Sequence, residues 1–481
     1  MTVVGTTPSD LSGMPEGPEF EGVISARDGD NVQVTSADGT RTVIALSPAT
    51  EIRSSGGFLG LDKDQLSAAD LLNGPTIPAL AKPQAAAQEA LRKPIGSDPL
   101  RTIAERKKPA TVCITMSDIT RPVPNELLIT AILEELNAAG VPDSTCTILI
   151  ATGMHRPSTD AEREHMLGRA LMDRCTIIDH EADATDTHVK VSDDPPVSIN
   201  RLYAEADLKI VTGLIEPHFM AGYSGGRKGI CPGLVDLATV QRFHGVQTMG
   251  DLNSREGLME GNPCHHIAID VATKVGCDFL VNCAITHDRR PAGIYAGDMV
   301  EAHLAGCAQV GDWTSADIEQ PYDLVITSGG GYPLDESFYQ TIKGVVMALP
   351  ALHEESTLVV CSGCKEVGSP EFTALMAEYG TDHRAFLAHI ETSGVTGKDQ
   401  WSYQMHTRVL EKIGVENLLL ANDEIAQDDQ PDLAVSPLRG EGAVQQRVQA
   451  FIDRYVTDNP AARIAVVPEG PYTMLRVGVL A

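Results

Sequence analysis

Aromatic residues and long apolar runs are both scarce in this sequence. Aromatics make up 4% of its 481 residues, whereas Ala, Gly and Val are common, a composition that suits α/β layers better than an all-β sandwich. No apolar stretch approaches the length that crosses a membrane as a helix, so we expect no membrane-spanning segment. The N-terminal residues contain neither a basic region nor an apolar core, and we therefore expect no signal peptide.

Basic residues are also few. The chain has 37 Lys and Arg against 66 Asp and Glu, and its formal net charge of −29 argues against nucleic acid and anionic membrane surfaces as partners. An anionic substrate would need a local cluster of cations to overcome this overall field. The side chains that could supply such a cluster are Arg121, Arg156, Arg227, Lys228 and Lys343.

Two further absences limit the chemistry. The ten cysteines lack the dense, regular spacing of a small secreted scaffold, which predicts reduced thiols in a cytoplasmic protein. Cys361 and Cys364 form a lone C-x-x-C without a second pair, so we interpret them as structural. No complete Gly-x-Gly-x-x-Gly or Walker pattern occurs, which disfavours an ordinary dinucleotide or ATP site.

Strand, loop and helix patterns alternate along most of the chain. Residues 111–115, 147–151 and 208–211 are typical of buried strands, and residues 126–139 carry apolar side chains at helical spacing. A second alternation of the same kind begins near Tyr322. This rhythm predicts doubly wound parallel sheets, which bind ligands beyond the carboxyl ends of their strands.

The length predicts two or three domains. We expect two α/β domains with parallel sheets and an active-site cleft between them, plus a small β-rich N-terminal extension. The extension covers residues 1–80, with a β-hairpin unit at residues 22–46, and we interpret it as a packing or oligomerisation appendage of a possible homo-oligomer. The first domain covers residues 81–300 and is completed by residues 465–481, and the second covers residues 301–464.

A glycine-rich run at residues 223–228 (YSGGRK) is the most informative motif. Its glycines let backbone N–H groups approach an anion closely and its two cations add positive charge, so the run can cradle a phosphate. Taken alone, the run would suit a structural turn equally well. It ends at Lys228 and lies between His218 and His244, and three such groups around one loop can attach, ligate and protonate.

Three more polar clusters accompany this run, at residues 117–122 (SDITRP), 151–156 (ATGMHR) and 328–335 (SGGGYPLD). Together with the glycine-rich run they form an ordered set that resembles the nickel-dependent lactate racemase family. The motifs are long and colinear with those of the family, so the resemblance is far more specific than a lone glycine pattern. It is nearly continuous from Pro83 to the C-terminus and fades before that residue.

The resemblance implies a nickel pincer nucleotide as cofactor. This group is a pyridinium-3-thioamide-5-thiocarboxylic acid mononucleotide that binds nickel through carbon and two sulfurs, and separate biosynthetic enzymes would supply it. Lys228 matches the lysine that forms the covalent thioamide, and His244 matches the histidine ligand to nickel, a metal that imidazole suits. The other residues implied to contact the cofactor are Asp118, Thr120, Gly225, Gly226 and Arg227.

The resemblance also implies the catalytic and substrate-binding residues. His155 and His218 match the acid/base pair of the family, a role for which imidazole suits because its pKa lies near neutrality. The residues implied at the substrate are Arg121, Tyr339, Gln340, Lys343 and Trp401. Arg121 could hold a carboxylate through two hydrogen bonds, whereas a plain core position fits Trp401 nearly as well. Asp118 could equally be a turn or capping residue.

We therefore predict a cytoplasmic racemase of a small 2-hydroxy acid, lactate or a related carboxylate. Hydride transfer to the tethered cofactor would avoid the carbanion that direct removal of the proton on carbon requires. The first alternative is a racemase or epimerase of a larger hydroxy acid, such as an aldonate, a malate-like acid or an aryl 2-hydroxy acid. The second is a non-catalytic nickel- or nucleotide-binding protein, which would not need two acid/base histidines.

Overall fold

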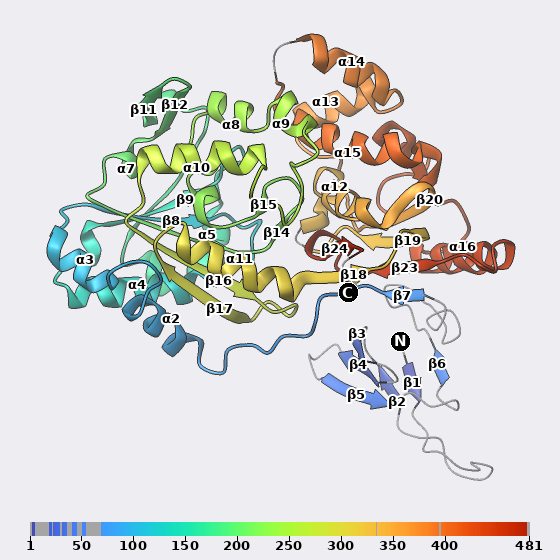
Figure 1. Ribbon diagram of the computed structural model, residues 1–481, viewed down its shortest axis with the longest axis horizontal. Helices are drawn as coiled ribbons and strands as arrows, with labels where there is room; N and C mark the ends of the chain where they lie inside the picture. Colours follow the sequence, from blue (N-terminus) through green and yellow to red (C-terminus); the bar gives the residue numbers. More distant parts are fainter. Residues whose placement is uncertain are drawn as a thin grey trace.

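Figure 1 shows the computed structural model, which describes residues 69–478 apart from Pro333 and residues 394–395. Before residue 54 it also gives the backbone of β1 (Thr2–Val4), β2 (Glu19–Glu21), β3 (Val23–Asp28), β4 (Asn31–Thr35), β5 (Arg41–Ala45) and β6 (Glu51–Arg53). Strands β3, β4 and β5 pair antiparallel, as expected for the hairpin unit at residues 22–46. The rest of the expected extension up to residue 68 lies outside the described residues.

The first sheet has the strand order β10-β9-β8-β13-β16-β17. All its neighbours pair in parallel except β17, which is antiparallel to β16. One apolar core packs α2, α3 and α4 on one face, and α8 and α10 pack on the other (Figure 1). The strands are β8 (Val112–Ser117), β9 (Cys146–Ala151), β10 (Thr176–Asp179), β13 (Leu208–Leu214), β16 (Phe279–Ile285) and β17 (Pro291–Gly297). The helices are α2 (Pro83–Arg92), α3 (Leu100–Lys107), α4 (Asn125–Ala138), α8 (Leu237–Phe243) and α10 (Pro263–Val275).

The second sheet has the order β22-β21-β20-β19-β23-β7, and all its neighbours are parallel. Helix α16 (Val444–Asp458) covers one face, while α12 (Phe338–Met347) and α15 (Gln400–Ile413) cover the other, toward the first domain (Figure 1). The strands are β7 (Ala69–Leu71), β19 (Tyr322–Ser328), β20 (Leu352–Cys361), β21 (Leu418–Ala421), β22 (Ser436–Pro437) and β23 (Ile464–Val467). The expected two α/β domains with parallel sheets are therefore present.

The buried strands explain why the sequence patterns were informative. In β8 every residue from Val112 to Met116 is buried, as is typical of a parallel strand covered by helices on both faces. The helix expected at residues 126–139 is α4, which ends one residue earlier. Thr159 and Glu162 close a capping box at the start of α5 (Asp160–Leu167), so that helix begins where its polar side chains satisfy free backbone N–H groups.

The residues near the two ends of the chain belong to different domains from those expected. Residues 465–481 do not simply complete the first domain, because β23 lies between β19 and β7 in the second sheet and β24 (Met474–Val477) pairs with β18 (Ser315–Ile318). Strand β7, expected in the N-terminal extension, is the edge strand of the second sheet. Helix α11 (Glu301–Thr314) packs on β16 and β17, so the first domain continues beyond residue 300. A short apolar strand pattern does not specify which sheet the strand joins.

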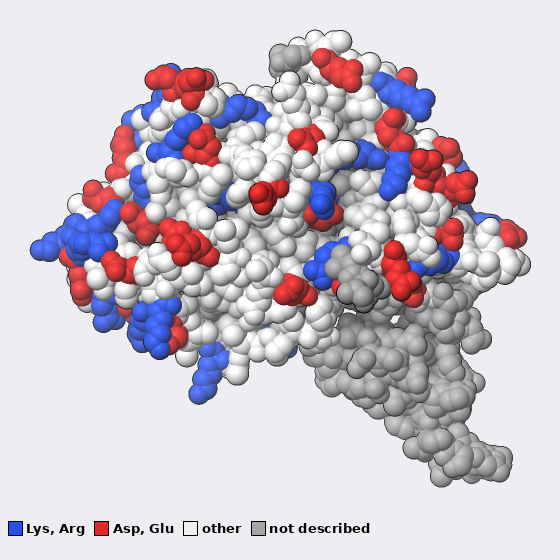
Figure 2. Space-filling model, in the orientation of Figure 1, with Lys and Arg blue, Asp and Glu red and all other residues white. Residues whose placement is uncertain are grey.

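The parallel register brings the polar loops together. Val112 of β8 pairs with Cys146 of β9 and with Leu208 of β13, so these neighbouring strands end at one edge of the sheet. The clusters at residues 117–122 and 151–156 follow two of these strands directly. Among the described helices, none is long and apolar enough to cross a membrane. Acidic and basic side chains are interspersed on the face in Figure 2, so the net negative charge does not form a single acidic patch there.

Candidate active site

One pocket between the two domains collects almost every residue predicted for the site. The first domain contributes the loops after β8 and β9, the segment after β13, and the glycine-rich run; the second contributes α12 and the start of α15. The predicted residues that line the pocket are Asp118, Thr120, Arg121, His155, His218, Gly225, Lys228, His244, Tyr339, Gln340, Lys343 and Trp401. The expected cleft is therefore present, and the two domains are both needed to close it.

His155 is oriented by a buried carboxylate. Its Nδ1 donates to Oδ2 of Asp118 at 2.6 Å, which fixes the ring and leaves Nε2 as an acceptor in the neutral form. The other carboxylate oxygen of Asp118 accepts from the backbone N–H and the hydroxyl of Thr120, at 3.2 and 2.6 Å. Burial alone would raise the pKa of Asp118, but His155, Thr120 and Arg121 together hold it below its usual value. Asp118 thus stays ionised. It orients His155 and is also a turn residue through its bond to the Thr120 N–H, but it caps no described helix.

His218 is held differently. It lies on β14 (Pro217–His218), which pairs with β15 (Gly222–Tyr223), and its ring stacks on Phe219 with centroids 5.0 Å apart. The backbone N–H of Met220 donates to Nδ1 at 3.4 Å. Burial, followed by the charges of Lys228 and Arg121, holds the pKa of His218 well below its usual value. The ring is therefore neutral in the pocket without a bound ligand.

Lys228 carries an amine that can lose its proton near neutral pH. Burial, and after it the neighbouring guanidinium groups of Arg227 and Arg121, lower its pKa to about 7. Its Nζ lies 5.2 Å from the centre of the Phe243 ring. Because only an uncharged amine acts as a nucleophile, this environment suits a lysine that forms a covalent bond.

The backbone of the glycine-rich run leaves no room for a side chain at Gly225. Gly225 has a φ of +72°, and a Cβ there would lie 2.8 Å from Oδ1 of Asn282. The same oxygen accepts the N–H of Gly226 at 2.8 Å. Asn282, which sequence analysis missed, thus fixes the turn that carries Lys228 into the pocket. A single Asn inside a buried strand was the signal for it.

Arg227 and Gly226, expected to contact the cofactor, do not line the pocket. The Arg227 guanidinium is buried and donates to the carbonyl oxygens of Tyr223 and Ala221, at 2.9 and 2.6 Å. Gly226 packs against the ring of His303 instead of lining the pocket. The physical reason is local geometry, because adjacent residues in the short 3-10 helix Gly226–Gly229 point in different directions. Arg156, another expected cation, pairs with Glu162 outside the pocket at 2.7 Å.

His244 and Trp401 meet at the domain interface. His244 follows α8 and stacks on Trp401 with centroids 4.8 Å apart, and Trp401 also packs edge-on against Tyr339. Nδ1 of His244 is buried and has no hydrogen-bond partner. Burial, then the charge of Lys228, keeps the pKa of His244 well below its usual value, so the ring is neutral and can donate an electron pair. Trp401 therefore borders the pocket and also belongs to the core.

Two cations and an amide converge from α12 and the loop after β8. Arg121 and Lys343 both line the pocket, and burial followed by the charge of Arg121 holds the pKa of Lys343 well below its usual value. Oε1 of Gln340 is buried without a partner, so it is an unused acceptor. The Tyr339 hydroxyl donates to Asp399 at 3.2 Å, so toward a substrate it can act only as an acceptor.

Glu216 is a second residue that sequence analysis missed. Its Oε1 lies 2.8 Å from Nε of Arg121, and both side chains are mostly buried. The available signal was its place in the Ile-Glu-Pro-His segment just before His218. A single Glu in a sequence is usually a solvent-exposed residue, so its contact with Arg121 could be recognised only from the fold.

Comparison with known proteins agrees with this fold. Residues 61–257 match the lactate racemase N-terminal domain, and residues 318–472 match the lactate racemase C-terminal domain. The lactate racemase of Thermoanaerobacterium thermosaccharolyticum is 30% identical over 394 residues, which cover 81% of this chain and 89% of that protein. The lactate racemase of Lactiplantibacillus plantarum is 32% identical over 393 residues, covering 80% and 89%.

Solved structures give the same result. The lactate racemase apoprotein from T. thermosaccharolyticum superposes with a TM-score of 0.78 at 28% identity and covers 89% of this chain and 99% of its own. A Thermotoga maritima protein superposes with a TM-score of 0.61 at 17% identity, covering 82% and 98%, which shows the fold alone. The fold is that of a two-domain α/β protein, and the similarity to lactate racemases makes it an enzyme of the isomerase class. The chain belongs to the lactate racemase family.

Proposed function

We propose that this protein racemises lactate or a closely related 2-hydroxy acid with a nickel pincer nucleotide tethered to Lys228. The observation that carries the proposal is the meeting of His155 and His218, from separate loops, in one pocket with Lys228. The similar proteins named as lactate racemases support the same substrate class. A protein that only bound nickel or a nucleotide would not need two histidines for proton transfer.

The side chains of the pocket fit the cofactor. His244 offers a neutral, buried ring with an unpartnered nitrogen, as a single protein donor to nickel requires. No cluster of three or more His, Cys, Asp or Glu that could hold a metal occurs among the described residues, so the remaining donors would come from the nucleotide. Lys228 offers an amine with a pKa of about 7 for the covalent tether. When bound, the group would supply a hydride acceptor and donor.

The protein would supply binding and proton transfer. Arg121 and Lys343 would hold the substrate carboxylate, and Gln340 would offer an acceptor to a hydroxyl. His155, oriented by Asp118, would take the hydroxyl proton of one enantiomer at Nε2, and His218 would serve the other enantiomer. Closure of the second domain over the first would exclude water.

The test uses protein produced together with the enzymes that make the pincer nucleotide. We expect an intact mass that shows a cofactor adduct on Lys228, nickel bound in equal amount, and racemisation of both D- and L-lactate. Substrate deuterated at C2 separates mechanisms, because internal hydride return retains the label whereas direct proton removal exchanges it with water. Unmodified protein, or complete loss of the label, would overturn the proposal. Parallel assays with aldonate, malate and aryl 2-hydroxy acids then define the preferred substrate.

A further inference from the structure

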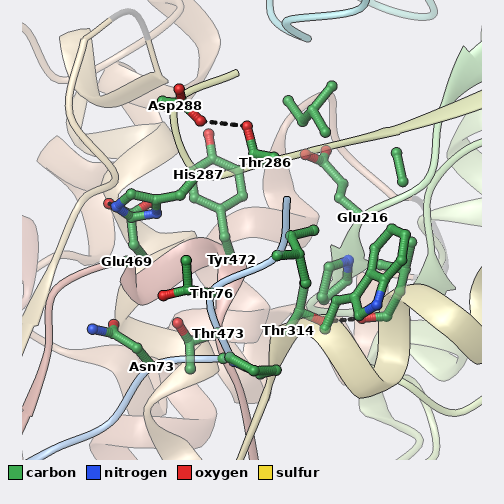
Figure 3. A pocket seen from close by; sticks show the side chains of 18 of the residues that line it. Asn73, Thr76, Glu216, Thr286, His287, Asp288, Thr314, Glu469, Tyr472 and Thr473 are labelled. Atoms are coloured by element: carbon green, nitrogen blue, oxygen red, sulfur yellow. Dashed lines mark hydrogen bonds and ion pairs between the residues drawn. The ribbon is translucent and has the colours of Figure 1, made fainter. Parts of the chain in front are cut away.

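A second cavity lies between the domains, on the far side of Arg121. Its volume is about 710 Å³, and it is lined by the segment after β7, the loop at residues 286–289, the end of α11 and residues 469–473. Figure 3 shows Glu216 on one wall of this cavity, across from His287 and Glu469. Among the described residues that line it, Glu216 is the acid that pairs with a residue of the catalytic pocket, Arg121.

The position of Glu216 is fixed by its backbone. Its N–H donates to the hydroxyl oxygen of Ser224 at 3.1 Å, and its carbonyl accepts the N–H of Ser224 at 2.9 Å. The carboxylate contacts Nε of Arg121, while Nη1 of Arg121 donates to the carbonyl of Thr120 at 3.3 Å. Because a guanidinium has five N–H directions, this arrangement leaves others for a ligand in the pocket. Glu216 therefore orients Arg121 without consuming it.

The negative charge of Glu216 also offsets the repulsion between Arg121 and Lys343. Arg121 and Lys343 line one pocket, and the pKa of Lys343 is lowered by burial and then by Arg121, while Glu216 acts in the opposite direction. Two cations that must bind the same carboxylate repel each other before the substrate arrives. A carboxylate placed behind Arg121, outside the pocket, reduces this repulsion without blocking the site.

We propose that Glu216 is a positioning residue that holds Arg121 beside Lys343 so that both cations bind the substrate carboxylate. This inference rests on the proposed function, in which Arg121 and Lys343 are the carboxylate contacts. The carboxylate of Glu216, which lines the second cavity, would thus position a side chain of the neighbouring candidate active-site pocket.

The experiment compares cofactor-loaded wild-type protein with Glu216→Gln and with Glu469→Gln, whose acid lines the same cavity but pairs with His287 at 3.2 Å. We expect Glu216→Gln to raise KM for the hydroxy acid about tenfold, the order of one charge-assisted contact, with kcat per loaded enzyme within about twofold. Glu469→Gln should leave both constants unchanged. An unchanged KM in Glu216→Gln, or a loss confined to kcat, overturns the inference.

A second comparison tests whether Glu216 acts through Arg121. In an Arg121→Ala background, Glu216→Gln should not raise KM further, and an equal additional rise would contradict positioning. If Glu216→Gln does not fold, Glu216→Asp keeps the charge with a shorter reach and should raise KM by a smaller factor; a wild-type KM there overturns the inference. Failure of the wild-type protein to racemise any 2-hydroxy acid would instead overturn the proposed function.

Discussion

The catalytic pocket and the interdomain cavity are neighbours with different chemistry. The pocket contains three histidines and the basic residues Arg121, Lys228 and Lys343, while the cavity is lined by several acids, of which Glu469 contacts His287 of the same cavity and Glu216 pairs with Arg121 of the pocket. Both spaces are closed by the same two domains. The difference indicates that this acidic chain gathers basic side chains in one of the two spaces, and the Arg121–Glu216 ion pair lies between the two regions.

The largest expected effect is the loss of covalent cofactor attachment when Lys228 is replaced. Replacement of Lys228 by Ala should abolish covalent cofactor loading, because the other amine that lines the pocket, that of Lys343, lies on α12 of the second domain and not on the glycine-rich run. Intact-mass analysis of protein made with the biosynthetic enzymes measures this directly. Lys209→Ala is the matched control, since its amine donates to the carbonyl of Val275 away from the pocket. A cofactor adduct on the Lys228→Ala variant would disprove the assignment.

The next effect concerns the proton-transfer groups. His155→Ala should lower kcat by about 10²- to 10⁴-fold in the loaded enzyme, the usual range for loss of a general acid or base. Asp118→Asn should cause a smaller loss, because the ring remains but its orientation by the 2.6 Å contact is weakened. Steady-state rates in both directions test these losses, with His165→Ala at an exposed position as control. Activity of His155→Ala within a few-fold of wild type would contradict the role.

A moderate effect should appear in the pH dependence of loading. The amine of Lys228 is charged below its pKa of about 7 and neutral above it. The rate of covalent attachment should therefore rise as pH increases toward 7 and level off above it. The initial rate of adduct formation, measured by mass at a series of pH values with purified apoprotein, checks this sign. A rate that falls with increasing pH would show that the charged form is the one required.

The smallest effect is expected for a substitution in the second cavity. His287→Asn removes the 3.2 Å contact with Glu469, whose side chains are 53% and 32% exposed. A polar contact this accessible contributes at most about 1 kcal/mol to the free energy of unfolding, and kcat and KM should not change. Denaturant unfolding and steady-state kinetics measure the two quantities. A large loss of activity would mean that the cavity is part of the catalytic site after all.

The sequence was sufficient for much of the fold because the strand and helix signals are local, whereas the roles expected of the site residues came from the family resemblance. Buried strands such as β8 are continuous apolar runs, and their ends put Asp118 and His155 at one sheet edge. What failed involved relations between distant segments or side-chain direction. The assignment of β23 to the second sheet and the burial of Arg227 both depend on packing that no local pattern encodes.

The sequence by itself determined the α/β class, the loops that carry polar motifs, and the residue types available for chemistry. It did so because strand and helix periodicity and turn residues act over a few neighbouring positions. The family resemblance implied that Tyr339, Gln340, Lys343 and Trp401 lie at the substrate, whereas only the tertiary structure placed them in one pocket with His155 and Lys228 and placed Glu216 behind Arg121. These placements follow from how two separately formed sheets pack together, since burial and charge pairing at that interface select one arrangement of side chains that are far apart in the chain.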